Sequence, residues 1–128
     1  MSPRSLQDMV SEAYGRIKST RAAEVGEAVK NGEYLVVDVR EPEEWNQGHI
    51  PGAILIPRGV LEFRADPASP SADPLLSSSK DRKILVHCAV GIRSALATDA
   101  LNEMGFTDVT NLEDGFGAWA AEGLPVER

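Results

Sequence analysis

The stretch Lys83-Ile84-Leu85-Val86-His87-Cys88-Ala89-Val90-Gly91-Ile92-Arg93-Ser94 indicates how this chain folds and where its chemistry lies. Its first five residues form a short apolar run of the kind that builds a buried strand. From Ser94 to Met104 the apolar side chains recur at the spacing of one helical face, and Gly105 is expected to end that helix. Cys88, the only cysteine in 128 residues, therefore lies in a glycine-containing loop between a strand and a helix.

A loop of this kind favours a negative group. Its backbone N–H groups point inward together, and the start of the following helix adds positive potential. Arg93 contributes a fixed charge and a planar fork of donors suited to oxyanions. We therefore expect Cys88 to be largely thiolate near neutral pH and nucleophilic. The alternative is an inert buried cysteine, but such a residue needs neither Gly91 nor Arg93 beside it.

Four separate segments, in the right order, resemble the rhodanese-type sulfurtransferase family. Residues 88–94 are similar to the family's active loop, and residues 36–45 and 48–53 resemble its first strand-and-turn signatures. Residues 112–119, followed by 123–126, resemble its closing segment. One departure is Asp114, which stands where the family commonly has the first of two glycines. The resemblance covers nearly the whole chain.

This resemblance implies a rhodanese-like three-layer α/β domain over residues 1–128, with a central, mostly parallel five-stranded sheet and helices on both faces. Strands alternating with helices, as in 34–39, 53–56, 83–87 and 108–112, independently predict such a parallel sheet. Residues 1–19 are expected to be a helical extension packed on the domain, with Ser5 and Asp8 as a capping pair. Residues 65–79 are expected to be an irregular loop that either shapes the substrate opening or is a surface insertion.

The implied reaction moves a sulfane sulfur from thiosulfate, or a similar small anionic donor, to cyanide or a thiol. Cys88 would carry the sulfur as a persulfide, with Arg93 beside it and no other cofactor. The backbone of the loop residues would cradle that sulfur: Ala89, Val90, Gly91, Ile92 and Ser94. A protein persulfide is a further candidate donor.

Three other polar residues are candidates for contact with substrate. Asp38 and Arg40 come at the end of a predicted strand, where open α/β sheets place binding groups, although an ion pair there is as easily structural. The resemblance implies that Asp38 helps to order the region around the active loop. Arg58 either reaches over the loop to an anion or is a solvated surface arginine. His87 is not expected to act as the base, because successive strand residues point to opposite faces.

Two alternative functions stay open at this point. The first is a binding or carrier module that exchanges a persulfide with a protein partner. The second is a cysteine phosphatase or arsenate reductase, which uses the same strand, cysteine, amide loop and arginine. Four residues separate Cys88 from Arg93, one fewer than in the phosphatase signature, so the loop is better fitted to a single sulfur atom than to a phosphate.

Composition excludes several classes of partner. A net charge of −7 makes nucleic acid and anionic membranes poor partners. Two histidines and one cysteine are too few for a compact structural metal site, so no metal is expected. The single cysteine and an N-terminus without a long apolar segment predict a cytoplasmic protein.

Overall fold

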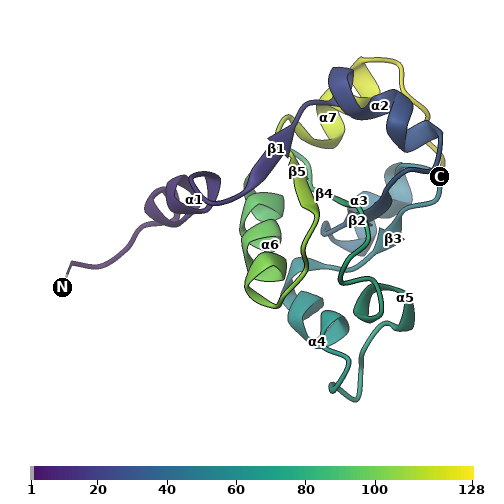
Figure 1. Ribbon diagram of the computed structural model, residues 1–128. Helices are drawn as coiled ribbons and strands as arrows, with labels where there is room; N and C mark the ends of the chain where they lie inside the picture. The colour runs from purple at the N-terminus through teal and green to yellow at the C-terminus, as the bar shows by residue number, and fades with distance from the viewer. Residues whose placement is uncertain (1) are drawn as a thin grey trace.

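The computed structural model describes residues 2–128 and places five strands in one sheet, in the order β1-β5-β4-β2-β3 (Figure 1). The strands are β1 (Lys18–Thr20), β2 (Leu35–Asp38), β3 (Ile54–Leu55), β4 (Ile84–His87) and β5 (Val109–Leu112). All neighbours pair in parallel. The predicted α/β fold is confirmed, and β4, which precedes Cys88, is the central strand.

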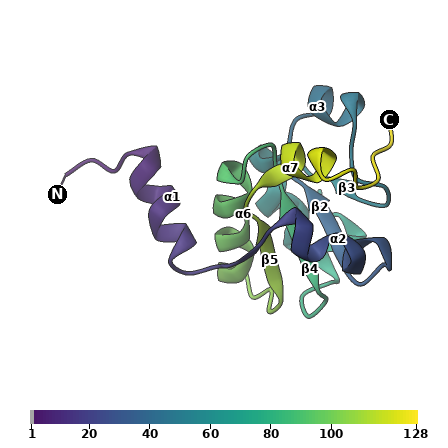
Figure 2. The ribbon, with the colours of Figure 1, turned by 90° about the horizontal axis from the view of Figure 1, so that it is seen from above.

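Helices cover both faces of the sheet, and each face has its own apolar core. Helices α2 (Ala22–Lys30) and α7 (Gly115–Ala121) lie on one face, and α4 (Leu61–Ala65), α5 (Pro74–Ser77) and α6 (Ile92–Glu103) on the other (Figures 1 and 2). Alternate residues of the central strand serve the two sides: Leu85 packs with Trp119 on the α7 face, while Val86 packs with Leu101 on the α6 face. Burial on both faces explains why β2 and β4 are almost continuously apolar.

The connection after β2 carries α3 (Pro42–Gln47), and a 3-10 turn (Arg58–Val60) follows β3. The predicted irregular loop over residues 65–79 is partly ordered by α5. Asp73 caps this short helix by accepting hydrogen bonds from the N–H groups of Leu75 and Leu76, and proline occupies its first position. Leu76 is fully buried, so the segment is anchored to the α4 and α6 side of the sheet.

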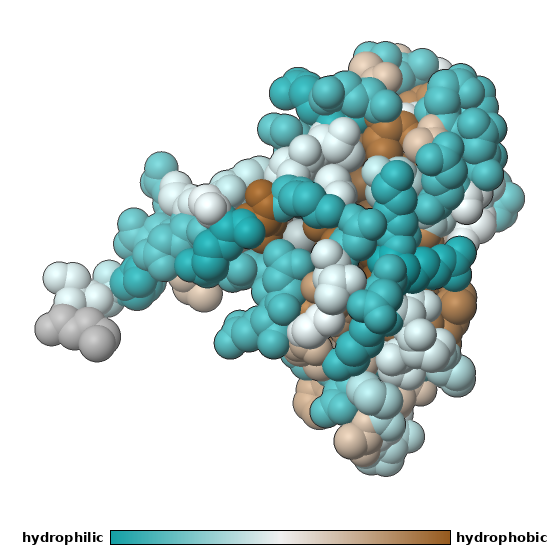
Figure 3. All heavy atoms as spheres, in the orientation of Figure 1, coloured by the Kyte–Doolittle hydropathy of each residue, from teal (hydrophilic) through white to brown (hydrophobic). Residues whose placement is uncertain are grey.

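The N-terminal helix α1 (Leu6–Tyr14) projects from the rest of the molecule (Figures 1 and 2). Its start has the predicted capping box between Ser5 and Asp8. The helix was expected to pack on the domain. It contacts α6, and its buried residue, Ala13, lies in the last turn, whereas Leu6 and Met9 are 60% and 50% exposed. Hydrophobic surface is visible where α1 meets the body (Figure 3). Within residues 2–128, no helix has both the length and the apolar character needed to cross a membrane.

Candidate active site

Cys88 comes directly after β4, at the carboxyl edge of the sheet. Its Sγ accepts hydrogen bonds from the N–H groups of Gly91 at 3.2 Å and Ser94 at 3.4 Å. The hydroxyl of Ser94 lies 3.4 Å from the same sulfur. The side chain is fully buried, between these loop groups and the apolar core on the α6 face of the sheet.

This environment favours the thiolate. Burial by itself raises the pKa of the Cys88 thiol, but hydrogen bonds from the Ser94 hydroxyl and from the backbone N–H groups of Ser94, Val90 and Gly91 outweigh it. The net pKa is below the ordinary value for a cysteine. Donors that stabilise the charged form produce this result.

Helix α6 begins at Ile92, two residues earlier than the sequence predicted, because Gly91 acts as its N-cap in the left-handed conformation, with φ of +87°. A Cβ atom at Gly91 would collide with the Glu113 carbonyl, so the loop passes too close to the segment after β5 for any other residue. Gly91 therefore shapes the loop and supplies one of its sulfur-binding N–H groups.

The N-terminus of α7 holds the loop from the other side. The Phe116 N–H donates to the Cys88 carbonyl at 2.9 Å, and a Cβ at Gly115 would collide with the Ala89 carbonyl. Asp114, the departure from the family pattern, accepts a hydrogen bond from the Ala22 N–H at the start of α2. The Asp114 side chain therefore links the start of α7 to the start of α2 and does not contact the sulfur.

Tyr14, at the end of α1, is a site residue that sequence reasoning missed. Its hydroxyl donates to the Gly91 carbonyl at 2.9 Å and accepts from the side-chain amide of Asn111 at 3.0 Å. The last turn of α1 is therefore hydrogen-bonded to the loop that surrounds Cys88. No local signal indicates this contact, because 77 residues separate the tyrosine from Gly91.

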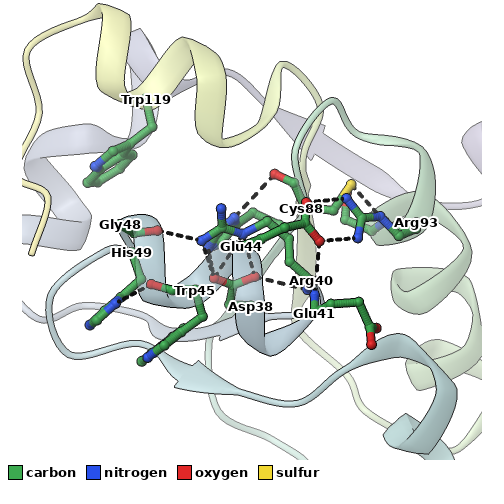
Figure 4. Close-up of polar contacts among 12 residues, drawn as sticks. Asp38, Arg40, Glu41, Glu44, Trp45, Gly48, His49, Cys88, Arg93 and Trp119 are labelled. Carbon is green, nitrogen blue, oxygen red and sulfur yellow. Dashed lines mark hydrogen bonds and ion pairs between the residues drawn. The ribbon is translucent and has the colours of Figure 1, made fainter. Parts of the chain in front are cut away.

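Arg93 lies beside Cys88, and its guanidinium forms a two-pronged ion pair with Glu44 of α3 (Figure 4). The two N–O distances are 2.7 and 3.0 Å, and both side chains are about one-third exposed. The Arg93 hydrogen bonds, opposed by a smaller effect of burial, lower the pKa of Glu44 to about 2. Glu44 is also missing from the predicted site, although it stands within one of the segments that resemble the family.

Asp38 and Arg40 bind each other in the interior of the domain. They form an ion pair with each other that is 0% and 4% exposed, and Arg40 also donates to the Gly48 carbonyl at 2.8 Å (Figure 4). The Arg40 guanidinium lies 4.3 Å from the ring centre of Phe116, the residue whose N–H holds the Cys88 carbonyl. These contacts favour the structural interpretation of the pair, in which Arg40 and Asp38 hold each other and pack beside Phe116.

The remaining predicted site residues either form an ion pair at the surface or belong to the loop that follows Cys88. Arg58 donates to Glu62 at 2.9 Å and remains partly exposed. Val90 and Ile92 are 65% and 41% exposed at the outer surface of the loop. The Ala89 carbonyl accepts a hydrogen bond from the Gly117 N–H, which ties this part of the loop to α7.

His87 points away from the sulfur. Its Nε2 lies 3.6 Å from Asp38, on the opposite side of β4, and burial lowers the pKa of its ring, which favours the neutral form. The prediction that it does not serve as the base for Cys88 agrees with this geometry. Among residues 2–128, no cluster of three or more His, Cys, Asp or Glu side chains is arranged to hold a metal ion.

Comparison with known proteins agrees with this geometry. The model of the rhodanese-like domain matches residues 21–122. The probable adenylyltransferase/sulfurtransferase MoeZ of Mycobacterium tuberculosis is 37% identical over 90 residues, which are 70% of this chain but 21% of MoeZ. Thiosulfate sulfurtransferase 16, chloroplastic, of Arabidopsis thaliana is 35% identical over 116 residues, covering 88% of this chain and 95% of the relative.

A solved structure resembles the whole molecule, including α1. It is a protein of unknown function from Rhodopseudomonas palustris, RPA3614, described as a possible tyrosine phosphatase. The two chains are 38% identical, with a TM-score of 0.91 over 99% of this chain and 97% of the other. The matched domain model, the sulfurtransferase relatives and the amide-lined cysteine loop together show that this chain belongs to the rhodanese-like domain family.

Proposed function

We propose that the protein is a sulfurtransferase that moves a sulfane sulfur from thiosulfate or a similar donor to cyanide or a thiol through a persulfide on Cys88. The observation that carries this proposal is the sulfur itself. It is held by the N–H groups of Gly91 and Ser94 and has a pKa below its ordinary value. Such a group combines an activated nucleophile with donors that stabilise negative sulfur.

The first step is attack by the Cys88 thiolate on the outer sulfur of the donor. With thiosulfate, a new S–S bond forms at Cys88, the donor S–S bond breaks, and its electron pair leaves with sulfite. The persulfide formed on Cys88 is an anion, and the loop N–H groups stabilise it. Because Cys88 is enclosed, the loop has to open for the donor to enter.

The second step returns the enzyme to its starting state. Cyanide or a thiolate attacks the outer persulfide sulfur, and the S–S electron pair returns to Cys88. The proposed cycle uses no resident cofactor or metal. Because the donor product leaves before the acceptor reacts, initial-rate plots should show parallel lines. A reducing compartment such as the cytoplasm suits this chemistry, because Cys88 has to remain a free thiol.

A cysteine phosphatase is the second candidate, favoured by the likeness to the RPA3614 structure, which is described as a possible tyrosine phosphatase. Against it stands the loop, in which four residues separate Cys88 from Arg93. The left-handed Gly91 draws this loop close around the sulfur, which accepts its hydrogen bonds directly. The space is therefore better matched to one sulfur atom than to a phosphate group. Hydrolysis of an aryl phosphate that is lost in Cys88→Ser would favour the phosphatase.

The deciding experiment is the intact mass of the reduced protein after incubation with thiosulfate, beside the Cys88→Ser variant. The proposal predicts a gain of one sulfur atom in the wild type only, and its loss on addition of cyanide. If thiosulfate adds nothing but a cysteine or protein persulfide does, the small-anion donor is wrong and the persulfide-carrier function is favoured. Absence of a sulfur adduct with every donor would refute sulfur transfer.

A further inference from the structure

Arg93, the positive charge that the sequence predicts beside Cys88, already forms an ion pair with Glu44. Two nitrogens of Arg93, Nη1 and Nη2, donate to the two carboxylate oxygens of Glu44, which occupies one edge of the guanidinium and places a negative charge beside its other donors. Glu44 is itself fixed, because its carboxylate also accepts the N–H of Glu41 in the capping box of α3. Its pKa of about 2 keeps it charged at neutral pH.

The arginines that follow the next two strands, Arg40 after β2 and Arg58 after β3, are paired as well. Arg40 is bonded to Asp38, and Arg58 is bonded to Glu62. Together with Arg93 and Glu44, these residues make three cations and three anions, with no net charge. A donor that enters the loop is therefore attracted by N–H groups and dipoles and not by an excess of positive charge.

We propose that Glu44 determines donor specificity: by holding Arg93, it disfavours compact dianions such as thiosulfate and makes persulfides, which carry at most one charge on the reacting group, the preferred donors. This inference rests on the sulfur-transfer function proposed above. It assigns to α3 a role that the loop sequence alone does not reveal. A dianion has to displace the Glu44 carboxylate or approach it closely, and both cost free energy that a persulfide avoids.

The reaction with a persulfide balances without a further reactant. The Cys88 thiolate attacks the outer sulfur of R–S–SH and forms Cys88–S–SH. The S–S bond of the donor breaks, and its electron pair leaves on the inner sulfur as R–S⁻. The proton stays on the transferred sulfur until the loop N–H groups favour its release. No oxidant or reductant is consumed.

The role of Glu44 can be tested without any sulfur donor, by comparing how fast Cys88 is alkylated by iodoacetate and by iodoacetamide. These probes have nearly the same size but differ by one negative charge, so the ratio of their rates reports the potential at the thiol and cancels changes in its ionisation. Glu44→Gln, which preserves the size and the capping acceptor, should raise the iodoacetate/iodoacetamide ratio by about threefold to tenfold. Glu43→Gln is the matched control, because Glu43 is exposed on the same helix and its loss changes the net charge equally.

An unchanged ratio in Glu44→Gln, or an equal rise in Glu43→Gln, would overturn the proposal. Donor kinetics then test the specificity itself. Wild type should have a higher kcat/KM for cysteine persulfide than for thiosulfate, and Glu44→Gln should narrow the difference by lowering the KM for thiosulfate. A wild type that prefers thiosulfate would also refute the inference. If neither donor loads Cys88, the sulfur-transfer function fails, whereas the alkylation ratio still decides what Glu44 does.

Discussion

Removal of the Ser94 hydroxyl tests whether the loop activates Cys88 as its geometry indicates. In the thiolate state this hydroxyl donates to Sγ across 3.4 Å, in a fully buried site. A hydrogen bond to a charged group contributes about 1.5–3 kcal/mol, and the long distance to a diffuse sulfur places this one near the lower end. Ser94→Ala should therefore raise the pKa of the thiol and shift its equilibrium toward the neutral form by about tenfold.

The assay is the rate of alkylation by iodoacetamide across a pH series, followed by intact mass. At pH values below the thiol pKa the variant should react about ten times more slowly, because less of it is thiolate, and the two rates should converge at alkaline pH. Thr98→Val is the control, since that buried hydroxyl donates to the Ser94 carbonyl at 2.8 Å and does not contact the sulfur. Equal rates for Ser94→Ala and wild type at every pH, or a loss as large in Thr98→Val, would refute the reasoning.

Three further predictions follow from the packing and charges of the site. Gly115→Ala should disrupt the loop around Cys88 and abolish sulfur loading, because its Cβ would collide with the Ala89 carbonyl. Gly123→Ala is the control, because Gly123 has a similar φ but open space around it, and this variant should retain loading. Intact mass measures the loading of both variants, and circular dichroism measures their folding. Asp38→Asn should lower the free energy of unfolding in urea by about 3–5 kcal/mol, because Arg40 is left as an unpaired buried charge. The fold lowers the pKa of Glu44 from 4.5 to about 2, so its ionic contribution is complete above pH 4.5 and is lost as the pH falls toward 2. The difference in urea midpoint between wild type and Glu44→Gln should shrink over that range, and a constant difference would contradict this linkage.

Much of the framework could be predicted from local pattern. The apolar run 83–87, the glycine after Cys88 and the periodicity of the next helix indicated the strand, loop and helix that hold the sulfur. Glycine and capping signals also placed the other elements, since they act over a few residues. The start of α6 differed by two residues because Gly91 adopts a left-handed N-cap, which a search for side-chain caps does not reveal.

The arrangement of distant groups could not be predicted in the same way. Asp38 and Arg40 stand at a strand end, as binding residues often do, yet the tertiary structure buries them as a pair under the loop. Residues 1–19 carry an apolar helical stripe, which requires an apolar partner but does not say where one lies. The structure leaves Leu6 and Met9 exposed and uses Tyr14 instead.

The sequence by itself determined the α/β class, the position of Cys88 after the central strand and the amide loop around it, because these depend on side-chain period, glycine and contacts within a few residues. Only the tertiary structure decided the contacts between distant residues. Glu44 pairs with Arg93, 49 residues further along the chain, and the Tyr14 hydroxyl bonds the carbonyl of Gly91, 77 residues further along. Gly115 likewise lies against the Ala89 carbonyl. Those contacts depend on the strand order β1-β5-β4-β2-β3, which places the carboxyl ends of β2, β4 and β5 next to one another. Parallel neighbours need crossover connections and burial of both sheet faces, so the order is a property of the whole chain and not of any one segment.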